Sequence, residues 1–326
     1  MVFPRKRQQD QAALIAGNAN LPLAQSIAHA YRQKLTDATV SRFSDGEIRV
    51  EINQNLRGRD VFLLQPTCPP VNDNLMELLI LADACRRASA RSVTAVVPYF
   101  GYSRQERKSA SRSPITAKLV ADMMVASGVN RVLSLDLHAP QIQGFFNIPV
   151  DNLYGMPLFA KDIQTKYKKK ANMVVVSPDV GGVRRARALA KELGCPIAII
   201  DKRRDTPNQS VVLHVIGDVK GKTCILLDDM VDTAGTLVNA AEALIDAHGA
   251  AHVSAYGTHG VLSGQAVERI MGSKLDEVVL TDTIRHELPK ECKNIRFISA
   301  APLLAEAMHR VITGESLSAL FTATNK

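Results

Sequence analysis

The sequence is most informative at residues 225–236, which read ILLDDMVDTAGT. A β-branched apolar run leads into a pair of acids, Asp228 and Asp229, and a third acid follows at Asp232. After it, a turn of small residues opens an alanine-rich helical pattern. An apolar run that ends in a turn before a helix is typical of a buried strand in a parallel sheet. Ligands of such sheets bind at the carboxyl ends of the strands, so this acidic turn is where we expect binding.

Similar strand patterns alternate with helical patterns along nearly the whole chain. Strands that are buried on both faces and alternate with amphipathic helices predict parallel sheets in an α/β fold. These strands are expected near 13–16 and at 60–65, 92–99, 131–138, 172–179, 197–202, 223–229, 252–260 and 277–282. Several of them end in an acid or a histidine, as expected for strand ends that carry chemistry.

The chain also repeats itself. Segment 56–99 can be laid over segment 219–257 so that Leu63 falls on Leu226 and the following strands align, with a longer turn in the first copy. This predicts a duplicated α/β domain in which only the second copy keeps the acids, and convergent strand–turn–helix patterning is the alternative. A chain of 326 residues is long enough for two ordinary domains, and segment 151–159 is the expected junction.

Composition and charge narrow the class of protein. Hydrophobic residues make up 46% and charged residues 22%, which is typical of soluble globular proteins, and we expect no membrane span. The net charge of +8 is compatible with nucleic acid, but aromatics are only 5% and tryptophan is absent, so phosphorylated small molecules are the expected partners. Five cysteines without CxxC spacing predict reduced thiols in the cytoplasm. The basic N-terminal segment, which lacks a signal-peptide-length apolar stretch, is expected to be a short extension.

The acidic turn combines two kinds of binding group. Backbone N–H groups at a helix N-terminus and the helix dipole attract anions, and the TAGT segment 233–236 adds small residues and hydroxyls. This predicts a phosphate monoester site. Asp228 and Asp229 would repel a bare phosphate, so we expect them to hold sugar hydroxyls or a divalent cation beside it. A helix cap with solvated acids is the alternative, but it does not account for the whole group.

Three further segments carry charged or polar groups near strand ends. Segment 98–114 contains clustered arginines that suit a polyphosphate, although a solvated basic loop has the same composition. The cations of 202–204 precede a segment that suggests a hairpin or flexible flap, where they could neutralise charge on a reacting phosphate, the alternative being a charged turn. His138 and Asp179 each follow a strand, where a packed or capping role is the alternative to metal binding. Segment 42–52 is expected to contain a strand after an Asp-Gly turn.

Together these segments resemble the class I ribose-phosphate pyrophosphokinases, the synthetases of phosphoribosyl pyrophosphate. The resemblance covers essentially the whole chain through FSDGEIRVEI, YSRQERK, DLHAPQIQGFF, VSPDVGGVRRAR, IIDKRR and the acidic turn, with Glu106 where the family usually has Asp. It implies two tandem phosphoribosyltransferase-type I domains related by pseudo-duplication, each a mostly parallel sheet flanked by helices. The implied domains are 1–156 and 157–305, with the tail 306–326 packing back on the first.

The resemblance also implies an activity. It is the magnesium-dependent transfer of the β,γ-pyrophosphoryl group of ATP to the anomeric hydroxyl of ribose 5-phosphate, which yields phosphoribosyl pyrophosphate and AMP for nucleotide, histidine and tryptophan biosynthesis. The implied assembly is a cytoplasmic homohexamer built from dimers, activated by inorganic phosphate and inhibited by ADP at a subunit interface. A phosphoribosyltransferase that uses the same acidic turn and a non-catalytic regulatory paralogue are the alternatives.

Residue roles are carried over position by position. The implied catalytic pair is Lys202 and Arg204. The implied ATP contacts are Phe43, Asp45, Glu47, Arg104 and Gln105. The implied metal ligands are His138 and Asp179. The implied ribose 5-phosphate site comprises Asp228, Asp229, Asp232, Thr233, Ala234, Gly235 and Thr236. Parts of the implied allosteric site are Arg57, Ser111, Arg112, Ser316 and Ser318.

Overall fold

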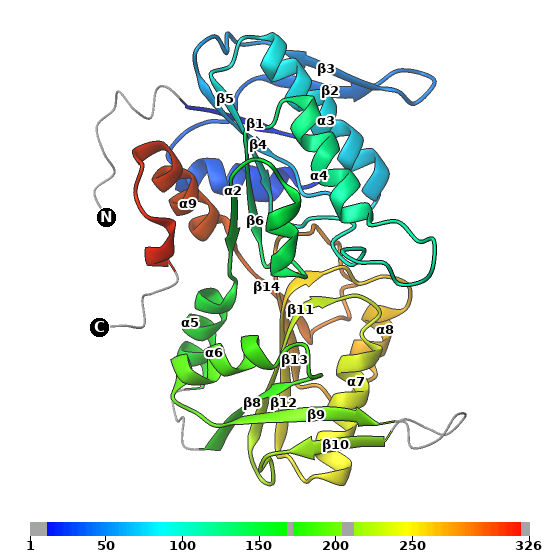
Figure 1. The fold of residues 1–326 in the computed structure, drawn as a ribbon. Helices are drawn as coiled ribbons and strands as arrows, with labels where there is room; N and C mark the ends of the chain where they lie inside the picture. Colours follow the sequence, from blue (N-terminus) through cyan, green and yellow to red (C-terminus); the bar gives the residue numbers. More distant parts are fainter. Residues whose placement is uncertain (1–11, 168–171, 204–211, 321–326) are drawn as a thin grey trace. The chain divides into compact units, whose positions relative to one another are not determined.

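The computed structural model describes residues 12–167, 172–203 and 212–320, and the chain divides into two compact units. Unit 1 comprises the described residues up to Tyr154, the short segment Thr283–Arg285 and the described residues from Ser299 on. Unit 2 comprises the described residues of Gly155–Asp282 and His286–Ile298. Each unit has its own sheet with helices on both faces, which confirms the predicted α/β class (Figure 1).

The sheet of unit 1 has five parallel strands in the order β1-β4-β5-β6-β7, and a separate antiparallel hairpin is formed by β2 and β3. The strands are β1 (Ala12–Ala16), β2 (Ala38–Arg42), β3 (Ile48–Ile52), β4 (Asp60–Leu64), β5 (Ser92–Val97), β6 (Arg131–Leu135) and β7 (Val150–Leu153). The helices are α2 (Leu21–Ala30), α3 (Val71–Arg87), α4 (Thr116–Ser127) and α9 (Ala301–Thr313), with short 3₁₀ segments η1 (Pro140–Phe145) and η4 (Leu317–Leu320).

Successive side chains of a strand point to opposite faces of the sheet, so the core of unit 1 has two parts, one on each face. Val61 and Leu63 of β4 join the apolar cluster that α3 and α4 cover. Phe62, between them, points to the other face, where its ring centroid lies 6.3 Å from that of Tyr31 at the end of α2. Helix α9 packs against α2, so the C-terminal helix belongs to this unit (Figure 1). Burial on both faces explains why β4 is apolar from Val61 to Leu64.

The sheet of unit 2 has seven strands in the order β10-β9-β8-β11-β12-β13-β14, all parallel except β10. The strands are β8 (Met173–Ser177), β9 (Ile197–Arg203), β10 (Val212–Ile216), β11 (Thr223–Val231), β12 (His252–Gly260), β13 (Glu277–Thr281) and β14 (Ile295–Ile298). One face packs on α5 (Met156–Lys166) and α6 (Val183–Leu193), and the other on α7 (Gly235–Glu242), its π-helical continuation (Ala243–Ala247) and α8 (Ala266–Met271).

The strand order of unit 2 reverses at β8. From β8 the chain adds β9 and β10 on one side, and then returns to place β11 on the other side of β8. The helices that follow β8 and β11 consequently lie on opposite faces, since α6 covers one and α7 the other (Figure 1). Such a reversal opens a crevice at the carboxyl ends of the two adjacent strands, where ligands bind in open α/β sheets.

The repeat noticed in the sequence is also a repeat of strand pairing. Leu63 on β4 pairs with Ala95 on β5, and Leu226 on β11 pairs with Ala255 on β12. The residues equated by the sequence therefore occupy the same register position in the two sheets. The correspondence extends to the strand order, because β1-β4-β5-β6-β7 matches β8-β11-β12-β13-β14.

In unit 1, side chains fill the carboxyl ends of β1 and β4. Gln65, which takes the place of Asp228 in the repeat, is buried, and its Nε2 donates to Oε1 of Glu77 at 2.8 Å. Glu77 also accepts from the main-chain N–H of Asn18 at 2.6 Å and from its Nδ2 at 3.0 Å. A Cβ on Gly17 would lie 2.3 Å from Oε1 of Gln65, so only glycine fits beside this cluster.

Strands β7 and β14 were not expected from the sequence, and neither was strand β2. Strands β7 and β14 have only four residues each, lie at the edges of their sheets and carry polar residues, so they lack the long apolar pattern of the central strands. Strand β3 follows the Asp45-Gly46 turn as predicted, but β2 pairs with it to make a hairpin. Among the described residues, no helix is both long and apolar enough to cross a membrane.

Candidate active site

Two loops meet at the strand reversal of unit 2. The first follows β8, which lies beside β11 with Val176 opposite Leu226. In this loop Oδ1 of Asp179 accepts from the N–H of Gly182 at 2.8 Å, and Oγ of Ser177 donates to the main-chain oxygen of Asp179 at 2.7 Å. A Cβ on Gly182 would come within 2.9 Å of Oγ of Ser177. The glycine is therefore needed for the tight packing that orients Asp179.

The second loop is the acidic turn, which begins inside β11. Asp229 is buried and Asp228 is partly exposed, while Ala234 at the start of α7 adopts a left-handed conformation with φ +62°. This conformation is unfavourable for a residue with a Cβ, and strain of this kind is concentrated at binding sites. The methyl side chain of Ala234 cannot cap α7, so the N–H groups of its first turn receive no hydrogen bond from this position. They can therefore bind an anion.

An arginine lies beside the paired acids. Nη1 of Arg185, on α6, donates to Oδ1 of Asp229 at 3.2 Å and lies 3.8 Å from Oδ1 of Asp228. Burial and the negative charge of Asp229 raise the pKa of Asp228 to about 7, although Arg185 opposes the shift. The pair is thus a crowded, only partly neutralised anionic site. Hydroxyl donors or a cation would stabilise its charged form.

Two residues beyond β12 support the far end of the turn. Ser263 donates from its N–H to the main-chain oxygen of Asp232 at 3.1 Å, and its hydroxyl also bonds the Asp232 carboxylate. Nη1 of Arg269 donates to the main-chain oxygen of Thr233 at 2.9 Å. Neither residue was singled out from the sequence, and neither was Arg185. The run RRAR after the glycine turn was the available signal for Arg185.

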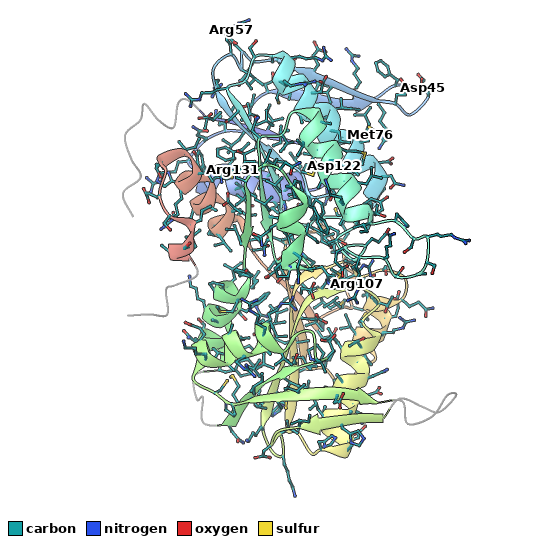
Figure 2. All side chains as sticks on the ribbon, in the orientation of Figure 1. Asp45, Arg57, Met76, Arg107, Asp122 and Arg131 are labelled. Atoms are coloured by element: carbon teal, nitrogen blue, oxygen red, sulfur yellow. The ribbon has the colours of Figure 1, made fainter. Side chains whose placement is uncertain are left out.

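The residues implied as adenine contacts lie at the tip of the β2–β3 hairpin in unit 1. The N–H of Phe43 donates to the oxygen of Glu47 at 2.8 Å, and the N–H of Glu47 donates to Oδ1 of Asp45 at 3.0 Å. Figure 2 shows Asp45 at the outer end of this hairpin. The side chain of Phe43 is 51% exposed, with the Arg49 guanidinium 6.0 Å from its ring centroid. An aromatic ring in this position is available for stacking.

Other implied ATP contacts lie at the carboxyl edge of the first sheet. Arg104 and Gln105 are exposed in the loop after β5, where Oε1 of Gln105 accepts from Oγ1 of Thr116 at 2.5 Å; Figure 2 marks Arg107 in the same loop. His138 is exposed just after the neighbouring strand β6. These residues therefore share one edge of the sheet, as the strand pattern predicted.

The expected metal and catalytic residues are not joined into one site by the described contacts. His138 belongs to unit 1 and Asp179 to unit 2, so their shared role stays a prediction. The described residues include no group of three or more His, Cys, Asp or Glu side chains suited to a metal. Magnesium commonly uses one or two carboxylates together with substrate phosphates, so single carboxylates such as Asp179 fit it. Arg204 and the side chain of Lys202 lie outside the described residues.

The residues implied for allosteric control all lie on exposed segments of unit 1. The N–H of Arg57 donates to Oδ1 of Asn55 at 2.9 Å. Arg112 has a left-handed φ of +63° in the loop that also contains Ser111. The main-chain oxygen of Ser316 accepts from Arg310 at 2.8 Å, and Ser318 lies in η4. Their joint role in one site stays a prediction.

Comparison with known proteins decides the family. Residues 12–128 match the N-terminal domain of ribose phosphate pyrophosphokinase, and residues 204–322 match the phosphoribosyl synthetase-associated domain. A ribose-phosphate pyrophosphokinase of Mesorhizobium japonicum is 57% identical over 309 residues, which is 94% of this chain and 99% of the relative. The chain belongs to the ribose-phosphate pyrophosphokinase family. The resemblance found in the sequence is thereby confirmed.

Other members of the ribose-phosphate pyrophosphokinase family are similar to this chain over nearly its whole length. The enzyme of Bradyrhizobium diazoefficiens is 58% identical over 309 residues, covering 94% of this chain and 97% of the relative. The crystal structure of phosphoribosylpyrophosphate synthetase from Mycobacterium smegmatis superposes with a TM-score of 0.87 at 42% identity, over 93% of this chain and 99% of that chain. Because the match runs nearly end to end, both units belong to the shared architecture.

Proposed function

We propose that this protein transfers the β,γ-pyrophosphoryl group of ATP to the anomeric hydroxyl of ribose 5-phosphate and releases AMP. The observation that carries the proposal is the acidic turn at the strand reversal of unit 2. There the buried Asp229 and the partly exposed Asp228 come shortly before α7, whose N-cap residue makes no side-chain hydrogen bond. Family membership supports the same activity, because the relatives bear the name ribose-phosphate pyrophosphokinase.

Each end of the sugar phosphate has a matching group in the acidic turn. The 5-phosphate would accept hydrogen bonds from the N–H groups and hydroxyls of 233–236, where the dipole of α7 adds positive charge. The ribose hydroxyls would donate to the carboxylates of Asp228, Asp229 and Asp232. These acids would orient the sugar, because hydrogen bonds from hydroxyl donors stabilise charged carboxylates that are largely shielded from water.

ATP would be bound mainly by unit 1. Arg104 and Gln105 would contact it at the carboxyl edge of the first sheet, and Phe43, Asp45 and Glu47 of a neighbouring copy would bind its adenine. Self-association is therefore part of the proposal, with a homohexamer as the implied assembly. His138 and Asp179 would hold magnesium, which when bound neutralises charge on the ATP phosphates. Inorganic phosphate and ADP would act through the residues around Arg112.

The transfer itself would be an in-line displacement at the β-phosphorus. The anomeric oxygen forms a bond to that phosphorus and its hydroxyl proton is released to water. At the same time the bond from the phosphorus to the bridging oxygen of AMP breaks, and AMP leaves with the electron pair. Lys202 and Arg204 would stabilise the charge that spreads over the phosphoryl oxygens. The main contribution of the other residues is positioning, which suffices for large rate effects in phosphoryl transfer.

The test is release of AMP from ATP, measured with and without ribose 5-phosphate in the presence of magnesium and phosphate. We expect AMP to form only when the sugar phosphate is present, in equal amount with phosphoribosyl pyrophosphate. A phosphoribosyltransferase would consume phosphoribosyl pyrophosphate with a base and leave ATP unchanged. A regulatory paralogue would bind the sugar phosphate without forming AMP. Either of the last two results would overturn the proposal.

A further inference from the structure

The first turn of α6 has an unusual charge pattern. It holds Arg184 and Arg185 and no acid, and Arg187 follows directly. Acids favour a helix N-terminus, whereas cations there are disfavoured by the helix dipole. Arg184 and Arg187 are exposed, whereas the side chain of Arg185 is only 25% exposed and lies against the acid pair. A partly buried cation at an unfavourable helical position indicates a specific partner.

That partner is the acidic turn. Nη1 of Arg185 donates to Oδ1 of Asp229 at 3.2 Å, and the Asp229 side chain is only 7% exposed. The N–H of Asp229 in turn donates to Oδ1 of Asp228 at 2.8 Å, and the Asp228 side chain is 21% exposed. Arg185 is therefore linked to both acids, directly to the buried one and through it to the more exposed one.

The same turn of α6 also holds the other loop of the site. The N–H of Gly182, the residue before the helix, donates to Oδ1 of Asp179 at 2.8 Å. Three residues later, Arg185 reaches across to β11 and bonds Asp229. One helical turn thus bonds the loop after β8 and the acidic turn after β11. A short rigid element that contacts two loops fixes the distance between the groups they carry.

We propose that Arg185 is a positioning residue that holds Asp228 and Asp229 in the orientation required by the ribose hydroxyls. This inference rests on the proposed function and assigns Arg185 to its sugar site. Without the guanidinium, the two neighbouring carboxylates would repel one another and turn apart. The sugar would then lose its paired acceptors, while the ATP contacts in unit 1 would keep their geometry.

The test uses Arg185→Ala and Arg185→Lys, with Arg184→Ala and Arg187→Ala as matched controls from the same helix. The dissociation constant of ribose 5-phosphate is measured by calorimetry without ATP, and kcat and the two KM values by AMP release. We expect Arg185→Ala to weaken ribose 5-phosphate binding by about tenfold to a hundredfold and to change the KM for ATP less than about twofold. Arg185→Lys should recover part of the affinity, and both controls should match the wild type.

Three outcomes overturn the inference. They are unchanged ribose 5-phosphate affinity in folded Arg185→Ala, equal rises in both KM values, and a loss as large in Arg187→Ala. If Arg185→Ala does not fold, the lysine variant decides, because full wild-type affinity there contradicts the partial loss expected when the guanidinium is replaced. Wild-type protein that binds ribose 5-phosphate but forms no AMP refutes the proposed reaction and leaves the role of Arg185 testable by binding. Wild-type protein that does not bind it refutes both.

Discussion

The main-chain N–H of Asp229 donates a 2.8 Å hydrogen bond to Oδ1 of Asp228, the residue before it. Burial and the charge of Asp229 raise the pKa of Asp228 to about 7, so Asp228 is mostly protonated below that pH and ionised above it. An ionised carboxylate accepts the stronger hydrogen bonds from hydroxyls. We therefore expect ribose 5-phosphate affinity to rise by up to about tenfold in total between about pH 6 and about pH 8, with most of the rise below about pH 7.

The control for this pH dependence is Asp228→Asn, measured by the same calorimetric titration. The ligand phosphate also titrates near neutral pH, and its contribution is common to both proteins. Only the difference between the two profiles reports Asp228. If the asparagine variant follows the wild-type profile, Asp228 does not titrate in the sugar site.

The left-handed conformation of Ala234 predicts opposite effects of two substitutions. Ala234→Gly keeps the conformation and should leave ribose 5-phosphate binding within about twofold of wild type. Ala234→Val places a β-branched residue at φ +62°, which costs about 1–2 kcal/mol and should reorganise the turn. We expect its affinity to fall at least about tenfold. Equal binding by both variants would show that the phosphate does not contact this turn.

A mixing experiment tests whether the β2–β3 hairpin acts on a neighbouring copy. Phe43→Ala should impair ATP binding, and Asp228→Asn should impair sugar binding. Co-expressed with different affinity tags, the two inactive chains should form mixed oligomers with up to about a quarter of wild-type activity. Mixed oligomers without activity would indicate that the hairpin serves the site of its own chain. Because the Phe43 ring is half exposed, the variant should keep the wild-type melting temperature.

Lys202 is expected to act on the transition state. Lys202→Ala should lower kcat by about a hundredfold or more, as loss of a charge-stabilising group does, and leave the dissociation constant of ribose 5-phosphate nearly unchanged. Rapid-quench measurement of AMP formation separates this chemical step from product release. An unchanged rate would remove Lys202 from the mechanism. A matched control is Lys191→Ala, on the exposed part of α6.

An ion-pair network in unit 2 predicts that the folded protein becomes less stable in acid. Arg296 donates from Nη1 and Nη2 to Asp162 at 2.9 and 2.5 Å and from Nε to Glu277 at 3.0 Å. Burial alone would raise the pKa of each acid, but hydrogen bonds from Arg296 hold both pKa values below their ordinary range. This stability is therefore present above the unfolded pKa values and is lost as pH falls through the folded ones.

Removing Arg296 should destabilise the protein and make its stability depend less on pH. Arg296→Met should lower the free energy of unfolding at neutral pH by about 1–3 kcal/mol, less than for a fully buried pair because the arginine is partly exposed. Thermal unfolding of both proteins at several pH values between about 3 and 7 measures the effect. A wild type that loses no more stability in acid than the variant would contradict it.

The central strands and the acidic turn were predictable because their signals are local. The apolar run before Asp228 and the small residues after Asp232 lie within one short segment. The short edge strands β7 and β14 were not predictable, because four partly polar residues form a strand only when a neighbour supplies the hydrogen bonds. Arg185 was missed for a related reason. Its partner Asp229 lies 44 positions away, so only the folded sheet brings them together.

The cluster around Glu77 has a consequence for redesign. Where the second repeat has Asp228, the first has Gln65, which donates to Glu77, and a Cβ on Gly17 would clash with the Gln65 side chain. Grafting an acidic turn onto β4 would place a new carboxylate beside Glu77, in the position where Gln65 now donates to it. To convert unit 1 into a second sugar-binding domain, the side chains of Gln65 and Glu77 would first have to be replaced by smaller ones.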